Sequence, residues 1–167
     1  MKYISFILLI LLFTSCGYKP SAKFSRMVIG DKISTSVDIS LVDPENTVII
    51  KDALDLAIIE VFHASLASKK DATSHLNIRL GNPTYTPIQY DRDGFIVSYR
   101  TTIRLLVKRE TANEEKNYIA IGTFDFSVAP NSIITDKQRF DAIKFSSIKA
   151  IQSFLAQISA EGARKKK

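Results

Sequence analysis

The chain has 167 residues, a formal net charge of +6 and a single cysteine, Cys16. The roughly 150 residues that follow the N-terminal segment suit one domain with one buried core. One thiol excludes an intramolecular disulfide, so the fold must depend on apolar burial. After residues 1–15, no other hydrophobic stretch approaches the ~20 apolar residues of a transmembrane helix.

Residues 1–15 have the layout of a secretory signal peptide. Lys2 supplies a positive end, and residues 4–13, apolar except for Ser5, form a run that is too short to span a bilayer. Two small residues then precede Cys16, as in a lipobox, which directs cleavage before the cysteine and acylation of its thiol and amine. The alternative is an ordinary cleaved signal that happens to end near a free cysteine.

Under the lipoprotein interpretation, residues 16–31 are the lipidated cysteine and a tether. Removal of residues 1–15 deletes only Lys2 among the charged residues and leaves a charge of +5. Two or more acyl chains would make membrane attachment effectively permanent. Gly17 stands where an inner-membrane retention signal has aspartate, which favours the outer membrane.

The first half of the domain alternates a strand, a helix and a strand. Strict period-two alternation over residues 32–41 predicts a half-buried strand. Asp43 and Pro44 are typical of a helix start, and apolar residues recur at helical spacing until about Ser68. Alternation returns at residues 74–81, so the two strands are predicted to pair in parallel through a crossover.

The second half is predicted to contain an antiparallel hairpin. Residues 82–87 contain two prolines, which predict a bent, bulged or edge position. Residues 91–94 form a turn that ends in glycine. A long alternating strand follows over residues 95–108, residues 111–116 form a charged turn, and residues 118–128 form the return strand.

A final helix of about 25 residues is predicted to begin after a capping box, Thr135 with Gln138, and to stop at Gly162. Residues 162–167 are predicted to be a basic tail. Residues 32–161 then form a single α+β domain, a two-layer sandwich with a four-stranded mixed sheet and two helices on one face, in the order β-α-β-β-β-α. The other sheet face is left uncovered.

Basic residues are predicted to collect on that uncovered face. Arg100, Arg104 and Lys108 share one side of the long strand, and Arg79 projects from the same side of its own strand. Guanidinium groups bind phosphates bidentately, so such a row suits an amphiphile that carries phosphates and acyl chains. Arg92, in the turn, could touch the same partner. The alternative is an ordinary solvated antiparallel face.

Catalysis has little support in the sequence. The chain has two histidines, His63 and His75, and its cysteine is predicted to be lipidated. The turn at residues 91–94 has too few oxygen ligands for calcium. No enzyme activity, no cofactor, no metal site and no nucleic-acid partner are therefore expected.

Three features together resemble one known family. They are the lipobox followed by Gly17 and Tyr18, the turn from Tyr90 to Gly94 that leads into a long amphipathic strand, and the order of strands and helices. The chain is similar in these respects to the lipopolysaccharide-assembly outer-membrane lipoprotein family, LptE, over the whole mature sequence.

The resemblance implies a two-layer α+β domain that plugs the lumen of the LptD-type β-barrel. It further implies help in folding the barrel and in delivering lipopolysaccharide to the outer leaflet. The positions assigned to lipopolysaccharide binding, Arg79, Arg92, Arg100, Arg104 and Lys108, come from the charge pattern and not from the family. The alternative function is an accessory lipoprotein of another envelope machine, for example one that docks to a transporter or to peptidoglycan.

Overall fold

The computed structural model describes residues 25, 27–39, 52–53, 55–56, 59–61 and 66–165. The predicted signal peptide, Cys16, most of the tether and most of the predicted helix from Asp43 lie outside the described residues. Helical residues are present between 52 and 61. Among them, Ala53 is fully buried in the core and Glu60 forms an ion pair with Lys144 of the C-terminal helix at 2.9 Å.

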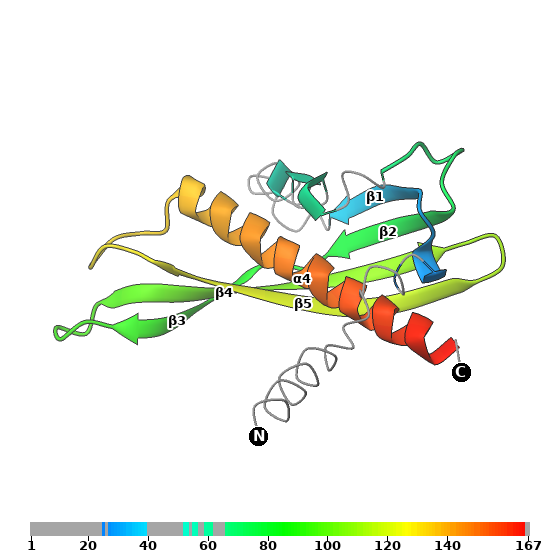
Figure 1. Cartoon of the computed structure of the whole chain (residues 1–167). Coiled ribbons are helices and arrows are strands. Elements are labelled where there is room, and N and C mark those ends of the chain that lie inside the picture. The colour runs from blue at the N-terminus through cyan, green and yellow to red at the C-terminus, as the bar shows by residue number, and fades with distance from the viewer. Residues whose placement is uncertain are drawn as a thin grey trace, which may run out of the picture.

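Besides the short helical stretches before β2, the described domain has five strands and one long C-terminal helix, an α+β fold as predicted (Figure 1). The elements are β1 (Ile33–Ile39), β2 (Ser74–Leu80), β3 (Thr84–Tyr90), β4 (Ile96–Glu110), β5 (Glu115–Ser127) and α4 (Asp136–Lys165). β1 and β2 pair in parallel, as expected from the crossover, and all other pairs are antiparallel.

The expected number of four strands is wrong, because the proline-containing segment forms a strand of its own. β2 pairs with the C-terminal half of β4, and β3 pairs with the N-terminal half of the same edge of β4. The break between β2 and β3 comes at Gly81, whose amide donates to the carbonyl of Arg104 at 3.0 Å. Pro87 is tolerated because β3 is an edge strand with register shifts beside the proline, in agreement with the predicted bulge.

β4 is the central strand of the sheet, since β5 pairs with its whole other edge. Figure 1 shows α4 lying across one face, while β3 and the adjoining parts of β4 and β5 extend past the N-terminal end of the helix. The core lies between α4 and the broader end of the sheet. Its buried apolar side chains include Leu76, Ile78, Leu80, Ile103, Leu105, Val107, Ile143, Ile151, Phe154 and Ile158.

The start of α4 follows the predicted capping box. Thr135 Oγ1 accepts from the amide of Gln138 at 3.3 Å, and Gln138 Oε1 accepts from the amide of Thr135 at 3.0 Å. The predicted stop at Gly162 is wrong, because α4 continues to Lys165. Among the glycines of the described residues, positive φ is found at Gly30 and Gly94, and not at Gly162. A glycine that keeps helical backbone angles costs a helix only about 1 kcal/mol, so α4 can continue through it.

Candidate functional site

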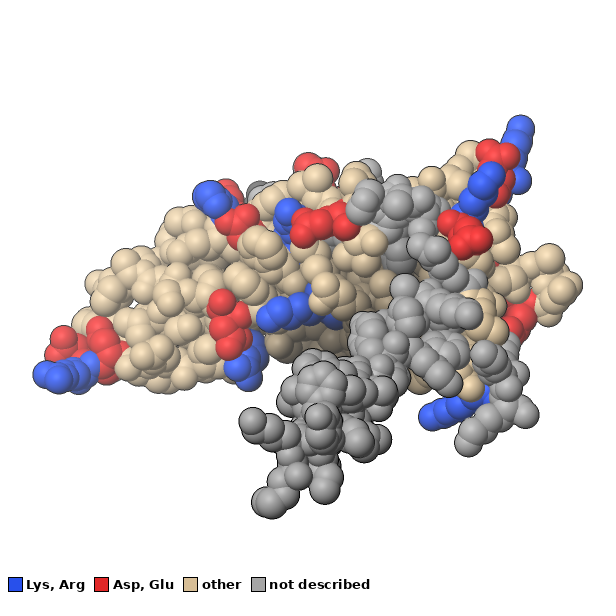
Figure 2. All heavy atoms as spheres, viewed as in Figure 1, with Lys and Arg blue, Asp and Glu red and all other residues tan. Residues whose placement is uncertain are grey.

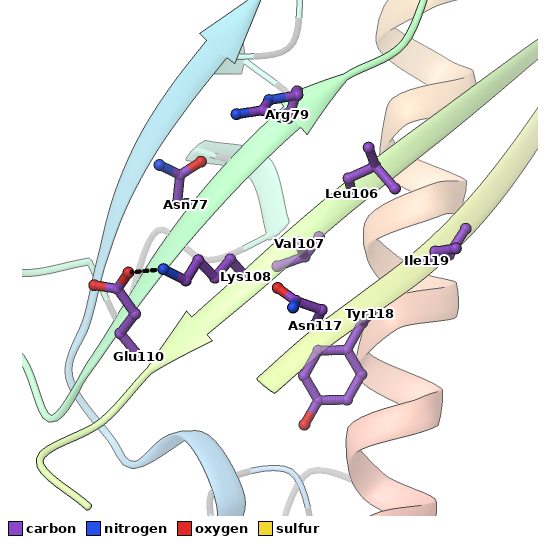
Figure 3. Close-up of a pocket in the computed structure, with 9 residues that line it drawn as sticks. All are labelled: Asn77, Arg79, Leu106, Val107, Lys108, Glu110, Asn117, Tyr118 and Ile119. Carbon is purple, nitrogen blue, oxygen red and sulfur yellow. Dashed lines mark ion pairs between the residues drawn. The ribbon is translucent and has the colours of Figure 1, made fainter. Parts of the chain in front are cut away.

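The sheet face opposite α4, here called the open face, is built by the alternation of β4. Ile103, Leu105 and Val107 point into the core and are buried. The residues between them must therefore point to the other side of the sheet. In Figure 3 the open face is toward the viewer and the helix lies behind the strands.

The structure places four of the five predicted basic residues on the open face. Arg100, Arg104 and Lys108 belong to β4, and Arg79 belongs to β2, where it lies opposite Leu106. Arg92 is not brought together with them. It lies in the exposed turn between β3 and β4. Figure 1 shows this turn at one end of the molecule, and Figure 2 shows charged side chains at the same end.

Two of the predicted residues are neutralised by acidic neighbours. Arg100 donates two hydrogen bonds to the carboxylate of Asp125 on β5, both at 2.8 Å. This pairing raises the pKa of Arg100 and lowers the pKa of Asp125. Lys108 lies 3.0 Å from both Glu110 and Glu115, and it holds the pKa of Glu110 below its ordinary value. Neither cation offers a full free charge to a ligand.

Arg79 and Arg104 are more available. Arg79 is 3.9 Å from Asp38, a long and exposed contact that contributes little. Arg104 is exposed, and none of the ion pairs found within the described part of the chain involves it. Its cross-strand neighbour is Ile121 of β5.

Arg104 borders a group of exposed apolar side chains, here called the apolar patch, that consists of Leu106, Ile119 and Ile121. Leu106 is paired with Ile119 across the β4–β5 ladder, and the three residues are 40%, 53% and 47% exposed. A pocket of about 520 Å³ lies against this patch, and its lining includes Arg79, Leu106 and Ile119 (Figure 3). The arrangement offers apolar area beside guanidinium groups, which suits a ligand with both acyl and anionic parts.

One charged cluster on the core side was missed by the sequence reasoning. The side chain of Arg109 is only 2% exposed; it donates to the carbonyl of Val28 at 2.7 Å and to Glu114 at 3.0 Å. Glu161 of α4 lies 3.6 Å from Arg109 and also binds Lys116 at 2.7 Å. The alternation of β4, continued two residues beyond Val107, would have indicated that Arg109 points inward.

Among the tyrosines in the described part of the chain, Tyr85 and Tyr118 have raised pKa values. Burial raises the pKa of Tyr118 to about 12, and the hydrogen bond that its hydroxyl donates to Glu161 at 2.8 Å acts in the same direction. Burial also raises the pKa of Tyr85 to about 12, with a partial opposing effect of Arg139. Both hydroxyls therefore stay protonated in the native protein at neutral pH.

These shifts predict an alkaline limit of stability. A tyrosine in the unfolded chain has a pKa of ~10, whereas Tyr85 and Tyr118 in the native protein have pKa values of about 12. The free energy by which these two protonated hydroxyls stabilise the native protein is therefore complete below about pH 10 and is lost between about pH 10 and 12. Tyrosinate absorbance, recorded together with circular dichroism, should show two tyrosines that ionise late and with unfolding, and Tyr118→Phe should remove one of them. Ionisation of all tyrosines near pH ~10 in a protein that stays folded would contradict this expectation.

In the turn between β3 and β4, backbone amides satisfy the carboxylate of Asp91. Asp91 Oδ1 accepts from the amides of Asp93 and Phe95 at 3.0 and 2.8 Å, and Gly94 has a φ of 84°. Within the described ranges, no group of three or more histidine, cysteine or acidic side chains is placed to hold a metal ion. Nor does any helix in that part of the chain have the length and apolar character needed to cross a membrane.

A comparison with known protein families identifies the family of this chain. The model of the family LptE, lipopolysaccharide-assembly, matches residues 34–158, which span the sheet and most of α4. The chain belongs to the LptE family. LptE proteins are non-enzymatic lipoproteins of lipopolysaccharide assembly, so this chain is an LptE-type lipoprotein of the cell envelope.

Several solved structures are similar to this LptE-family chain at low sequence identity. Rare lipoprotein B from Shewanella oneidensis has 12% identity and a TM-score of 0.45, over 80% of this chain and 99% of that one. A minor lipoprotein from Acinetobacter baumannii has 12% identity and a TM-score of 0.44, over 78% and 92%. Lipoprotein B from Nitrosomonas europaea has 14% identity and a TM-score of 0.40, over 88% and 93%. No curated protein matches the chain in sequence.

Proposed function

We propose that this LptE-family chain is an outer-membrane lipoprotein that partners and plugs an LptD-type β-barrel. In this role it assists barrel assembly and the insertion of lipopolysaccharide into the outer leaflet. Acyl chains on Cys16 anchor it after removal of residues 1–15, and the domain lies in the periplasm or the barrel lumen. The observation that carries the proposal is the LptE match over residues 34–158.

The open face supports the ligand part of the proposal. Lipopolysaccharide combines acyl chains with phosphates, and the apolar patch lies beside Arg79 and Arg104. A guanidinium group binds phosphate bidentately, while exposed leucine and isoleucine side chains offer area for acyl chains. Arg100 and Lys108 keep the face polar through their ion pairs, as expected of a protein enclosed by a barrel.

Purification from native membranes tests the barrel partnership. Tagged full-length protein, extracted with mild detergent, should carry with it one large heat-modifiable β-barrel in equal stoichiometry. A Cys16→Ala variant serves as a control for the anchor, since it should be lost from the outer-membrane fraction. Recovery of the protein alone, or with inner-membrane transporter subunits, would reject the plug function and favour an accessory lipoprotein of another envelope machine.

Charge reversal at Arg104 tests the ligand site. Arg104→Glu should weaken lipopolysaccharide binding by the full-length protein at least tenfold, because one charge-assisted contact of about 1.5 kcal/mol or more is lost and a repulsion is added. Arg104 is the cleanest position, since Arg100→Glu would also break the pair with Asp125. Binding is measured by displacement of a fluorescent lipopolysaccharide.

The matched control for Arg104→Glu is Lys137→Glu. Lys137 is an exposed cation in the first turn of α4, on the other layer of the fold, and its described ion pair is with Asp141. The same change of two charge units there should leave the affinity within about twofold, because exposed pairs contribute little. Equal affinities for both variants would remove Arg104 from the site. Arg92→Glu tests the predicted contact at the hairpin tip separately.

A further inference from the structure

A second hollow lies on the open face next to the apolar patch. It has a volume of about 430 Å³ and is formed at the start of β1 and β2 and the end of β4. Asn77 and Glu110 line both this hollow and the pocket against the patch, so the two adjoin. Apart from Ala67, every side chain that lines it is polar or charged: Ser34, Thr35, Ser36, Lys69, His75, Asn77 and Glu110. This hollow is called the polar pocket below.

The imidazole of His75 is held in one orientation inside the polar pocket. Its Nδ1 lies 2.8 Å from the hydroxyl oxygen of Ser34, and its Nε2 lies 3.1 Å from that of Ser36. All three residues belong to paired strands, with Ser34 directly opposite His75 in the parallel ladder. Hydrogen-bonding groups that are fixed on rigid strands lose little freedom when they bind a ligand.

The charges around the polar pocket cancel. Lys108 is paired with both Glu110 and Glu115 at 3.0 Å, and Lys69 lies close enough to lower the pKa of Glu110 together with His75 and Lys108. Two lysines and two glutamates leave no excess positive charge for a phosphate. Serine, histidine and asparagine side chains both donate and accept hydrogen bonds, which is what neutral hydroxyl groups require.

We propose that the polar pocket binds uncharged sugar hydroxyls, as the saccharide subsite of the ligand site on the open face. This inference rests on the proposed function. It gives the bound amphiphile a direction along the sheet. Acyl chains and phosphates lie at the apolar patch with Arg79 and Arg104, and the sugars extend toward β1 and the start of β2.

The test uses full-length protein in a detergent without a sugar headgroup, with two probes. The first probe is a deacylated and dephosphorylated core oligosaccharide, and the second is whole lipopolysaccharide. His75→Ala should weaken binding of both probes about fivefold, because the hydroxyls of Ser34 and Ser36 lose the imidazole that orients them. The loss corresponds to one neutral hydrogen bond of about 1 kcal/mol. Arg104→Glu should weaken only the lipopolysaccharide, because the oligosaccharide carries neither phosphates nor acyl chains.

Asn77→Ala is the second variant. The change removes an amide from the polar pocket without disturbing the contacts of His75 with Ser34 and Ser36, so the test remains valid if His75→Ala misfolds. Thr86→Ala is the matched control, since Thr86 is an exposed hydroxyl residue on β3 opposite Arg100, away from both pockets. It should bind both probes like the unaltered protein.

The outcomes separate the two proposals. If lipopolysaccharide binds but the oligosaccharide does not, or if His75→Ala and Asn77→Ala bind the oligosaccharide unchanged, the saccharide subsite is wrong and the proposed function stands. If the oligosaccharide binds in a His75-dependent way and lipopolysaccharide does not bind, the subsite stands and the ligand part of the proposed function is wrong.

Discussion

Gly122→Ala should destabilise the domain by about 3 kcal/mol, the largest loss expected for a change of one methyl group. Gly122 lies in β5 at a close approach of α4 to the sheet. A Cβ atom at this position would lie 2.0 Å from the carbonyl oxygen of Ser146 and 2.4 Å from the amide nitrogen of Ala150. Both are backbone atoms of the helix, so no side-chain rotation can relieve the overlap.

The helix must therefore move away from β5 when Gly122 is replaced. Such a movement separates Ile151 and Phe154 of α4 from the rest of the core and leaves a cavity there. The row of small residues on this side of the helix, Ala142, Ser146 and Ala150, is fully buried and makes the close approach possible. Gly122→Val should leave no cooperatively folded domain.

Urea denaturation followed by circular dichroism measures the effect of Gly122→Ala. Gly81→Ala is the matched control, because a Cβ atom there would meet its nearest atom, the carbonyl oxygen of Arg104, at an ordinary 3.6 Å. The control should change the free energy of unfolding by less than about 1 kcal/mol. Equal stability of the two variants would mean that α4 does not contact β5 at Gly122.

Arg109→Met is expected to cost about 3 kcal/mol, for an electrostatic reason. Arg109 connects three parts of the chain, since it donates to Val28 before β1, pairs with Glu114 in the β4–β5 turn and lies near Glu161 of α4. The Glu161 side chain is only 12% exposed. Loss of the guanidinium group leaves this largely buried carboxylate with less compensating charge and leaves the Val28 carbonyl without its donor.

The neighbouring Lys108 gives a matched control for Arg109. Lys108→Met removes an equal charge from the same strand, but from the open face, where its carboxylate partners can be hydrated. We expect a change within about 1 kcal/mol, as for other exposed pairs. The double variant Arg109→Met/Glu161→Met should recover part of the loss, because apolar side chains of similar size often replace a buried pair at little cost. Similar stabilities of Arg109→Met and Lys108→Met would refute a structural role for the buried cluster.

Local features of the fold were predictable because a few neighbouring residues specify them. The capping box at Thr135 forms with the predicted partners, and the predicted turn ends at Gly94, which has a φ of 84°. The alternation in β4 correctly assigned Arg100, Arg104 and Lys108 to one face. Proline in the predicted second strand gave the right physical conclusion, an edge position with a bulge, although it belongs to a separate strand, β3.

The sequence by itself determined the α+β class, the polar and apolar faces of the four predicted strands, and the presence of a basic row on the face opposite the C-terminal helix. Those properties follow from the period of a strand and a helix, which a short stretch of chain already contains. Only the tertiary structure decided which of the basic residues keep their charge available. Arg100 meets Asp125 and Arg104 meets Ile121 because of the register between β4 and β5, and period-two alternation carries no information about which residue of another strand lies opposite.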